Sequence, residues 1–386
     1  MAYTALEQMR KTNRERFNAD VGPFEPALYG AGRQGSDLKS AALRFLHERC
    51  EGLRFSPEKA KQEEQTGTYL GTSYRPNQIP YNMQMDIDRL CLERELEAFI
   101  DSGVAEDAYT VYYSFLEMFM GAYGRSSKMI ELLSEFESNA SSLLMKHRDH
   151  YSHSVYVFAL GLAIYETNES FRTTFQRFYG FVSNADEARA AAFFLEYWGL
   201  TSLFHDIGYP FEIPFEQGLA YFEVDRKARG EGSMYLAYRD LDCLNNLGEE
   251  AKTHFTELFG RSFENVEQLL AYGIEKRLGA AYDVSEEYLY DTICKKPTDP
   301  NRFGYFMDHA YFSATRLYQE LVERCGADAL TEAHVDVLTA IMLHNSMFKF
   351  AIAFYKSKEK RKAPLKMELH PLVYLLMLCD ELQCWD

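Results

Sequence analysis

Helical periodicity dominates this chain from residue 83 onward and constrains the fold more than any other feature. Apolar residues recur three and four positions apart over stretches such as 83–103, 150–166, 187–206 and 308–324. Strand-like alternation is rare, and no glycine-rich phosphate loop follows a predicted strand. We therefore predict an all-α fold.

Composition divides the chain into an N-terminal extension and a larger helical domain. Residues 1–80 are rich in Gly and Pro, and we interpret 1–125 as a largely helical extension of unknown role. Residues 126–386 form the predicted helical bundle, and the heterogeneous segment 228–302 is interpreted as an insertion between core helices. Further helices are predicted at 107–123, 127–145, 212–227, 248–258, 266–278, 331–355 and 370–385.

The charge balance limits the partners that this chain can bind. Its 386 residues carry a formal net charge of −17, and 47% of them are apolar. An apolar fraction of this size supports a packed core and excludes wholesale disorder. So acidic a chain repels phosphate backbones, which argues against non-specific nucleic-acid binding but leaves room for a local phosphate pocket.

Cysteine usage and hydropathy indicate a cytoplasmic protein. The seven Cys are scattered and form no CxxC pair, which is typical of reduced thiols. The N-terminal residues lack the apolar region of a signal peptide. The longest apolar stretch, 337–355, is interrupted by His344, Asn345 and Lys349, so we expect a buried helix and no membrane contact.

Several predicted helices contain an ionisable residue inside an otherwise apolar run. Each residue alone is explained most simply as a hydrogen-bonded core histidine, a helix cap or a member of a salt bridge. Together they suggest a metal centre, because one cation compensates several buried ligands at once. Their nitrogen and carboxylate ligands suit Mn, Fe, Co, Ni or Zn, with Mg less favoured. The candidate ligands are His153, His205, Asp206, His309, His344 and Asp380.

The doublet His205-Asp206 is the most informative element of this set. It is followed by Ile207, Gly208, Tyr209 and Pro210. Gly208 can adopt the left-handed conformation of a helix C-terminus, and Pro210 prevents the helix from continuing. We therefore expect the doublet on the last helical turn, facing a cavity. The alternative is an ordinary helix end with a chance His-Asp pair.

These motifs together resemble the HD-domain superfamily of metal-dependent phosphohydrolases. The resemblance is carried by HS-x-x-V at 153–157, HDIG at 205–208, DH-x-x-x-SA at 308–314, LHN at 343–345 and LLMLCDELQ at 375–383. It covers residues 127 to the end of the sequence and leaves 1–125 without a counterpart. It implies an all-α bundle whose helices meet at a metal site.

The resemblance also implies which residues bind metal. Its minimal signature maps to His153, His205-Asp206 and Asp380, and two further histidines, His309 and His344, imply two divalent ions with Asp206 bridging. The sequence departs from some cyclic-dinucleotide phosphodiesterases, because GYP overlaps the HDIG motif at 208–210. His150 lies three residues before His153 and is an alternative ligand.

The implied reaction is hydrolysis of a phosphate ester by a metal-activated hydroxide. Asp206 would orient the nucleophile, and His150 is a candidate for protonating the leaving group. The expected partner is a small phosphorylated ligand, such as a nucleotide or cyclic nucleotide. Lys349 and Arg316 could bind its phosphate, although a snorkelling stem or a surface salt bridge is an equally good interpretation of both. Asn345 and Tyr209 could line the pocket.

Two alternatives stay open at this point. The first is a regulatory module that binds metal and ligand and acts through a partner surface on residues 1–125. The second is a structural metal that holds the fold together, in which case metal removal would melt the protein. The sequence also leaves a homo-oligomer open.

Overall fold

We describe a computed structural model of the chain, and the structure describes residues 38–50, 68–69, 72–73, 81–120, 150–181, 187–209, 245–294, 308–353 and 364–382. The regular elements among these residues are helices, apart from one antiparallel pair of two-residue strands, β1 (Thr68–Tyr69) and β2 (Thr72–Ser73). The predicted all-α fold is therefore confirmed. The expected helices at 127–145 and 212–227 lie outside the described residues.

The chain forms two compact units. The first comprises Met1–Glu196 with Trp385–Asp386, and the second comprises Tyr197–Cys384. The division falls inside helix α9 (Glu187–Phe204). The expected boundary after residue 125 lies outside the described residues, so the predicted division into 1–125 and 126–386 stays a prediction.

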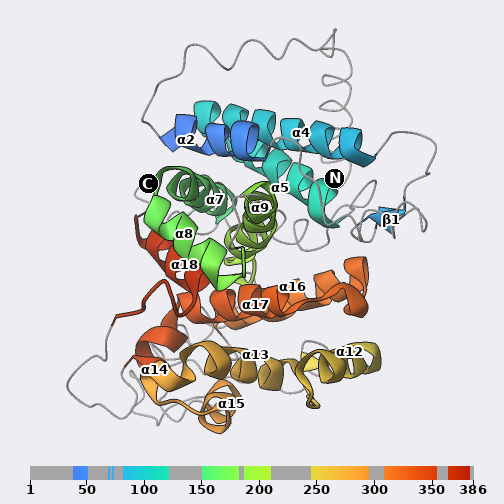
Figure 1. Cartoon of the computed structure of the whole chain (residues 1–386), viewed down its shortest axis with the longest axis vertical. Helices are drawn as coiled ribbons and strands as arrows, with labels where there is room; N and C mark the ends of the chain where they lie inside the picture. Colours follow the sequence, from blue (N-terminus) through green and yellow to red (C-terminus); the bar gives the residue numbers. More distant parts are fainter. Residues whose placement is uncertain are drawn as a thin grey trace, which may run out of the picture. The chain divides into compact units, whose positions relative to one another are not determined.

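The first unit packs its helices around an aromatic core. Helix α4 (Tyr81–Ser102) packs on α5 (Ala105–Met120), and α2 (Leu38–Arg44) packs on α7 (His150–Thr167) (Figure 1). At the centre, the ring of Tyr165 stacks on that of Phe194 with centroids 4.1 Å apart. The π-helical turn η2 (Phe45–Arg49) and α8 (Glu169–Phe178) add further rings, including Phe45, which meets Tyr165 edge-on at 5.4 Å.

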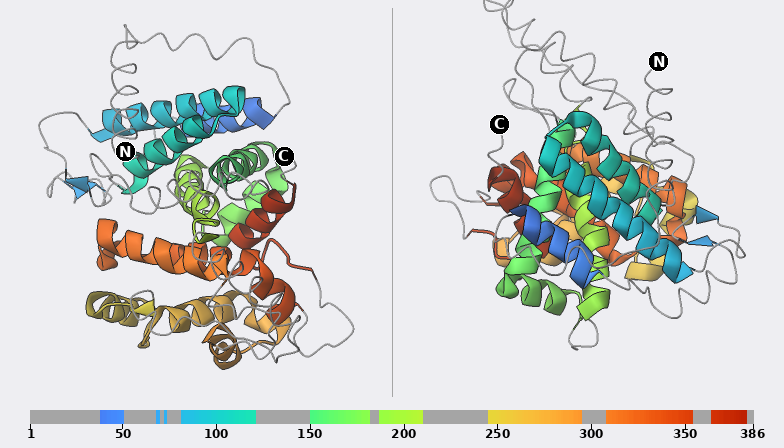
Figure 2. Two further views of the ribbon diagram at one scale, coloured as in Figure 1. Left: turned by 180° about the vertical axis from the view of Figure 1, so that it is seen from behind. Right: turned by 90° about the horizontal axis from the view of Figure 1, so that it is seen from above.

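The second unit is built around α17 (Glu332–His344), seen from two sides in Figures 1 and 2. Helix α16 (His309–Cys325), helix α13 (Val266–Ile274) and helix α18 (Pro371–Leu382) all pack on it. The backbone of α13 approaches α17 so closely that a Cβ at Gly273 would lie 2.8 Å from the Thr339 side chain. All three helices can therefore bring side chains to α17.

The predicted insertion contributes helices to this unit. Its described part, 245–294, forms α12 (Glu249–Phe259), α13, the π-helical turn η4 (Glu275–Gly279), α14 (Ala280–Tyr282) and α15 (Glu286–Cys294). Helix α13 packs on both α15 and α17. Segment 245–294 is therefore part of the helical core of the second unit.

The expected helix 331–355 is a single helix only as far as His344, so that prediction was wrong in part. Asn345 leaves helical geometry with φ −93° and ψ −124°, and a π-helical turn η7 (Phe348–Ile352) follows. The Asn345 side chain donates a hydrogen bond to Asp308, which gives the break a partner on another helix. The break leaves His344 as the last residue of α17.

Two sequence-based exclusions can be compared with the structure. The described helices do not combine the length and the apolar character that a membrane crossing requires. The described cysteines, at positions 50, 91, 294, 325 and 379, are free thiols.

Candidate metal centre

The HDIG segment closes α9 through a close backbone approach to α16. Helix α9 ends at Phe204, and residues 205–208 form a turn. The prediction that Gly208 adopts a left-handed conformation was wrong, because its φ is not positive. Instead, a Cβ at Gly208 would lie 2.2 Å from the carbonyl oxygen of His309 and 2.7 Å from the amide nitrogen of Ser313. The Gly208 amide also donates to the Ser313 hydroxyl at 2.8 Å, which holds the turn against α16.

Two histidines of the centre are oriented by their own helices. Nδ1 of His205 lies 2.7 Å from the carbonyl oxygen of Ser202, and Nδ1 of His344 lies 2.6 Å from that of Ile341. Because a carbonyl can only accept, the proton of each ring sits on Nδ1. When such a ring is neutral, its lone pair is therefore on Nε2, the atom that faces the centre.

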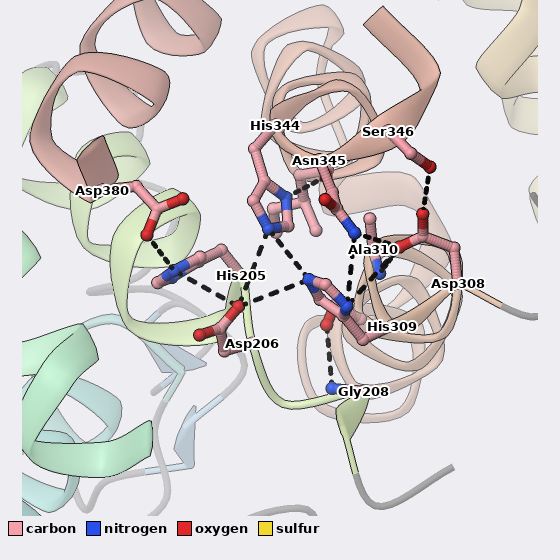
Figure 3. A network of polar contacts seen from close by, with 12 residues as sticks. His205, Asp206, Gly208, Asp308, His309, Ala310, His344, Asn345, Ser346 and Asp380 are labelled. Carbon is pink, nitrogen blue, oxygen red and sulfur yellow. Dashed lines mark hydrogen bonds and ion pairs between the residues drawn. The ribbon is translucent and has the colours of Figure 1, made fainter. Parts of the chain in front are cut away.

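Asp206 lies at the middle of three imidazoles (Figure 3). Its Oδ1 is 3.4 Å from Nε2 of His205, 3.6 Å from Nε2 of His344 and 3.7 Å from Nε2 of His309. These four residues are all buried. One carboxylate oxygen thus faces three ring nitrogens that come from three segments of the second unit.

The spacing of these atoms fits a shared cation. Two ligands about 2.1 Å from one ion lie about 3.4 Å apart in a tetrahedral site and about 3.0 Å apart in an octahedral one. The 3.2 Å between the Nε2 atoms of His309 and His344 falls in this range, whereas the 3.9 Å between Oδ1 of Asp380 and Nε2 of His205 lies beyond it. The trio His205, Asp206 and His344 could hold a metal ion.

An adjoining polar network, which our sequence reasoning missed, is centred on Asp308. Its carboxylate caps α16 by accepting from the Ala310 amide at 2.9 Å, and it also accepts from Asn345 at 3.0 Å and Ser346 at 2.5 Å. Burial alone would raise the pKa of this carboxyl, but the neighbouring His309 and these three donors outweigh it and hold the pKa below its ordinary value. The signal was present in the doublets Asp308-His309 and His344-Asn345.

The predicted substrate-binding residues lie in different surroundings. The ring of Tyr209 stacks on that of His309, with centroids 4.0 Å apart and planes 12° apart. Arg316 pairs with Gln319 and Glu320 on its own helix, and Lys349 is exposed above the ring of Phe350. Tyr209 therefore adjoins the centre, whereas the contacts described for Arg316 and Lys349 are local ones. Their role in phosphate binding stays a prediction.

Two predicted site residues belong to the first unit. His150 is the first residue of α7 and His153 lies on its first turn, and both are buried. Their predicted roles, His153 as a ligand and His150 as a proton donor, stay predictions.

Comparison with models of protein families, with curated proteins and with solved structures gave no match.

Proposed function

We propose that this chain is a metal-dependent phosphohydrolase of the HD-domain type, acting on a phosphate ester of a nucleotide or cyclic nucleotide. The observation that carries the proposal is the position of Asp206, whose Oδ1 lies 3.4–3.7 Å from three imidazole nitrogens. Two of these rings direct a lone pair towards it, because backbone carbonyls hold their protons on the opposite nitrogen. This donor set is typical of transition-metal sites.

The proposed ligands are those that the sequence motifs suggested. His205, His309, His344 and Asp380 would bind two divalent ions together with His153, and Asp206 would bridge them. When bound, divalent ions supply a hydroxide nucleophile near neutral pH and positive charge for phosphoryl oxygens. Of the possible metals, the mixed nitrogen and oxygen ligands favour Mn, Fe, Co, Ni or Zn.

The chain's own residues contribute orientation in this mechanism. The carbonyls of Ser202 and Ile341 fix the rings of His205 and His344, so that their Nε2 atoms are held in place before any ligand binds. Tyr209 covers one face of the His309 ring and would exclude water from that side. Asp206 would orient the attacking oxygen at the phosphorus atom, a contribution of the positioning kind.

The experiment combines elemental analysis with a substrate panel. The purified full chain is assayed for bound metal and for hydrolysis of nucleotides, cyclic nucleotides and a generic phosphodiester, alongside the variants Asp206→Ala and Asp206→Asn. We expect a divalent metal in the wild type and a loss of hydrolysis of at least about 100-fold in both variants. Asp336→Asn, a substitution at another buried carboxylate, is the matched control and should retain metal.

The outcomes separate the competing functions. A metal-loaded wild-type protein that is inert across the panel would refute the enzymatic proposal and favour a regulatory module. A protein that melts on chelation and hydrolyses nothing would indicate a structural metal.

A further inference from the structure

The histidines of the centre differ in how their rings are oriented. His205 and His344 each have the carbonyl of a residue three positions earlier beside Nδ1. His309 is the first residue of α16, so α16 itself does not offer it the acceptor three positions earlier that orients the other two rings. The carboxylate of Asp308 and the side-chain amide of Asn345 lie beside the Nδ1 atom of its ring.

Asp308 lies on the Nδ1 side of this ring. Its Oδ1 is 3.6 Å from Nδ1 of His309, while Nε2 on the opposite side of the ring faces Asp206 and His344. The distance of 3.6 Å is longer than a hydrogen bond, so the interaction is electrostatic. Oδ1 of Asp206 lies 3.7 Å from Nε2, so the two carboxylates favour opposite positions of the ring proton until a cation binds on the Nε2 side. With a cation bound there, the charge of Asp308 favours a proton on Nδ1 and leaves the lone pair on Nε2 for the metal.

The Asp308 carboxylate is itself fixed from two helices. It is buried, and it caps α16 through the Ala310 amide while Asn345 and Ser346 donate to it from the residues after α17. The amide nitrogen of Asn345 is 3.0 Å from Asp308 and 3.5 Å from Nδ1 of His309, so its better hydrogen bond is with the carboxylate. Residues directly adjacent to His309 and His344 are thereby tied together.

We propose that Asp308 is a positioning residue for His309, which holds the proton of that ring on Nδ1 and so presents Nε2 as a ligand atom. This inference rests on the proposed function, because it takes a divalent cation as the species that Nε2 binds. Carboxylates that orient a metal-binding histidine in this way typically contribute about 10–100-fold to metal affinity. Sequence motifs alone assigned no role to Asp308.

The test compares two ways of removing the Asp308 charge. Asp308→Asn keeps an acceptor for the Ala310 amide and so keeps the helix cap, whereas Asp308→Ala removes both. The control is Asn168→Ala, which removes the cap of α8 in the first unit, where the Asn168 side chain accepts from the Phe171 amide at 3.0 Å. Affinity for Co²⁺ or Zn²⁺ is measured by calorimetric titration of each metal-free full-length protein.

We expect Asp308→Asn and Asp308→Ala to lower the affinity about 10–100-fold. Asn168→Ala should lower the melting temperature without changing the affinity. The imidazole N–H signals of the Zn-loaded protein provide a readout that a purely structural role would not move. In the wild type we expect an N–H signal from Nδ1 of His309, and it is assigned to this residue because it should be missing from the spectrum of His309→Asn. In Asp308→Asn the same signal should shift or broaden.

The possible results separate this inference from the proposed function. Equal affinities and an unchanged His309 signal in Asp308→Asn would overturn the positioning role alone. A wild-type protein that binds metal but hydrolyses nothing would overturn the proposed function alone, while the affinity loss would still support the role of Asp308. A wild-type protein that binds no divalent cation would overturn both.

Discussion

The two ends of α17 both bury a carboxylate next to histidine, yet they satisfy its charge differently. Near the start of the helix, Asp336 receives a two-pronged contact from Arg277, with Nε and Nη2 each 2.8 Å from a carboxylate oxygen. At the other end, Asp206 faces the imidazoles of His205, His309 and His344. We call these two regions the Asp336 end and the Asp206 end.

The difference lies in the permanence of the positive charge. A guanidinium is always protonated, so Arg277 neutralises Asp336 at any physiological pH. An imidazole is positive only when it is protonated, and those of His205 and His344 have their Nε2 lone pairs turned inward. A buried carboxylate therefore takes part in a permanent ion pair at one end and in a His/Asp group that could hold a metal ion at the other, and the guanidinium of Arg277 distinguishes the two.

The largest expected effect is on stability at the Asp336 end. In Asp336→Ala, the half-buried Arg277 keeps only Glu332 among the acceptors described for it, so we expect a loss of about 3 kcal/mol in unfolding free energy. Urea denaturation measures the loss, and the double variant Arg277→Met/Asp336→Leu should recover part of it. The affinity of the folded protein for metal should not change, and a loss as large as that in Asp206→Ala would contradict the independence of the two ends.

Added metal should stabilise the protein through the Asp206 end and not through the Asp336 end. At a metal concentration about 100 times the dissociation constant, the wild type should gain about 2.7 kcal/mol in unfolding free energy. The gain should vanish in Asp206→Asn and persist in Asp336→Asn, since only the first substitution alters a proposed ligand. Denaturation with and without Zn²⁺ checks this, and an equal gain in both variants would refute the assignment.

The close backbone approach at Gly208 supports only the Asp206 end. The added Cβ of Gly208→Ala would collide with the His309 carbonyl, so we expect a cost of about 1–3 kcal/mol together with weaker metal binding. Gly180 has φ +81° and open space around its missing Cβ. Gly180→Ala should therefore cost about 1 kcal/mol from backbone conformation alone and leave metal binding intact. Calorimetric titration measures the metal affinity of both variants, and equal affinities in Gly208→Ala and Gly180→Ala would contradict this prediction.

The effect expected to be smallest at neutral pH concerns the histidine of the Asp336 end, His370, and it grows as the pH falls. Burial, assisted by the charge of Arg277, lowers the pKa of His370 from 6.5 to about 3. The unfolded chain therefore takes up this proton near pH 6.5 and the folded chain does not, so stability falls as the pH decreases below 6.5. One such group contributes a slope of about 1.4 kcal/mol per pH unit.

The matched variant is His370→Asn, which can still cap α18 because the wild-type ring accepts from the Val373 amide. Its unfolding free energy should depend on pH less steeply than that of the wild type between pH 6 and pH 4. Parallel pH profiles for the two proteins would show that His370 is protonated in the folded state as well.

Periodicity predicted the helices better than their ends. It located α7, α9, α16 and α18 to within two residues at their N-terminal ends, because closely spaced apolar residues mark each helix in the local sequence. It missed the break after His344, because the partner of Asn345 is Asp308, 37 positions away in the sequence. Gly208 was singled out correctly but for the wrong reason, since its need for a missing side chain arises from α16 rather than from its own turn.

The candidate site shows the same division between local and distant information. The residue types of the centre pointed to metal before any fold was known, and the structure gives a buried His/Asp group that could hold an ion. The Asp308 network was missed because a carboxylate before a helix is commonly only a cap. The proposed role of Asp308 beside His309 also depends on Asn345 and Ser346. Their proximity to Asp308 cannot be predicted from sequence spacing.

The different ways in which the histidine rings are oriented affect how this centre can evolve. The carbonyl that orients His205 or His344 lies three residues earlier in the same segment. We therefore expect substitutions in neighbouring helices to leave the orientation of these two rings unchanged. The orientation of His309 depends on residues from two separate segments. A substitution at position 308, 345 or 346 should therefore require a compensating substitution at one of the other two positions. Among sequences related to this one, we therefore expect positions 308, 345 and 346 to vary together, and the surroundings of the His205 and His344 rings to vary more freely.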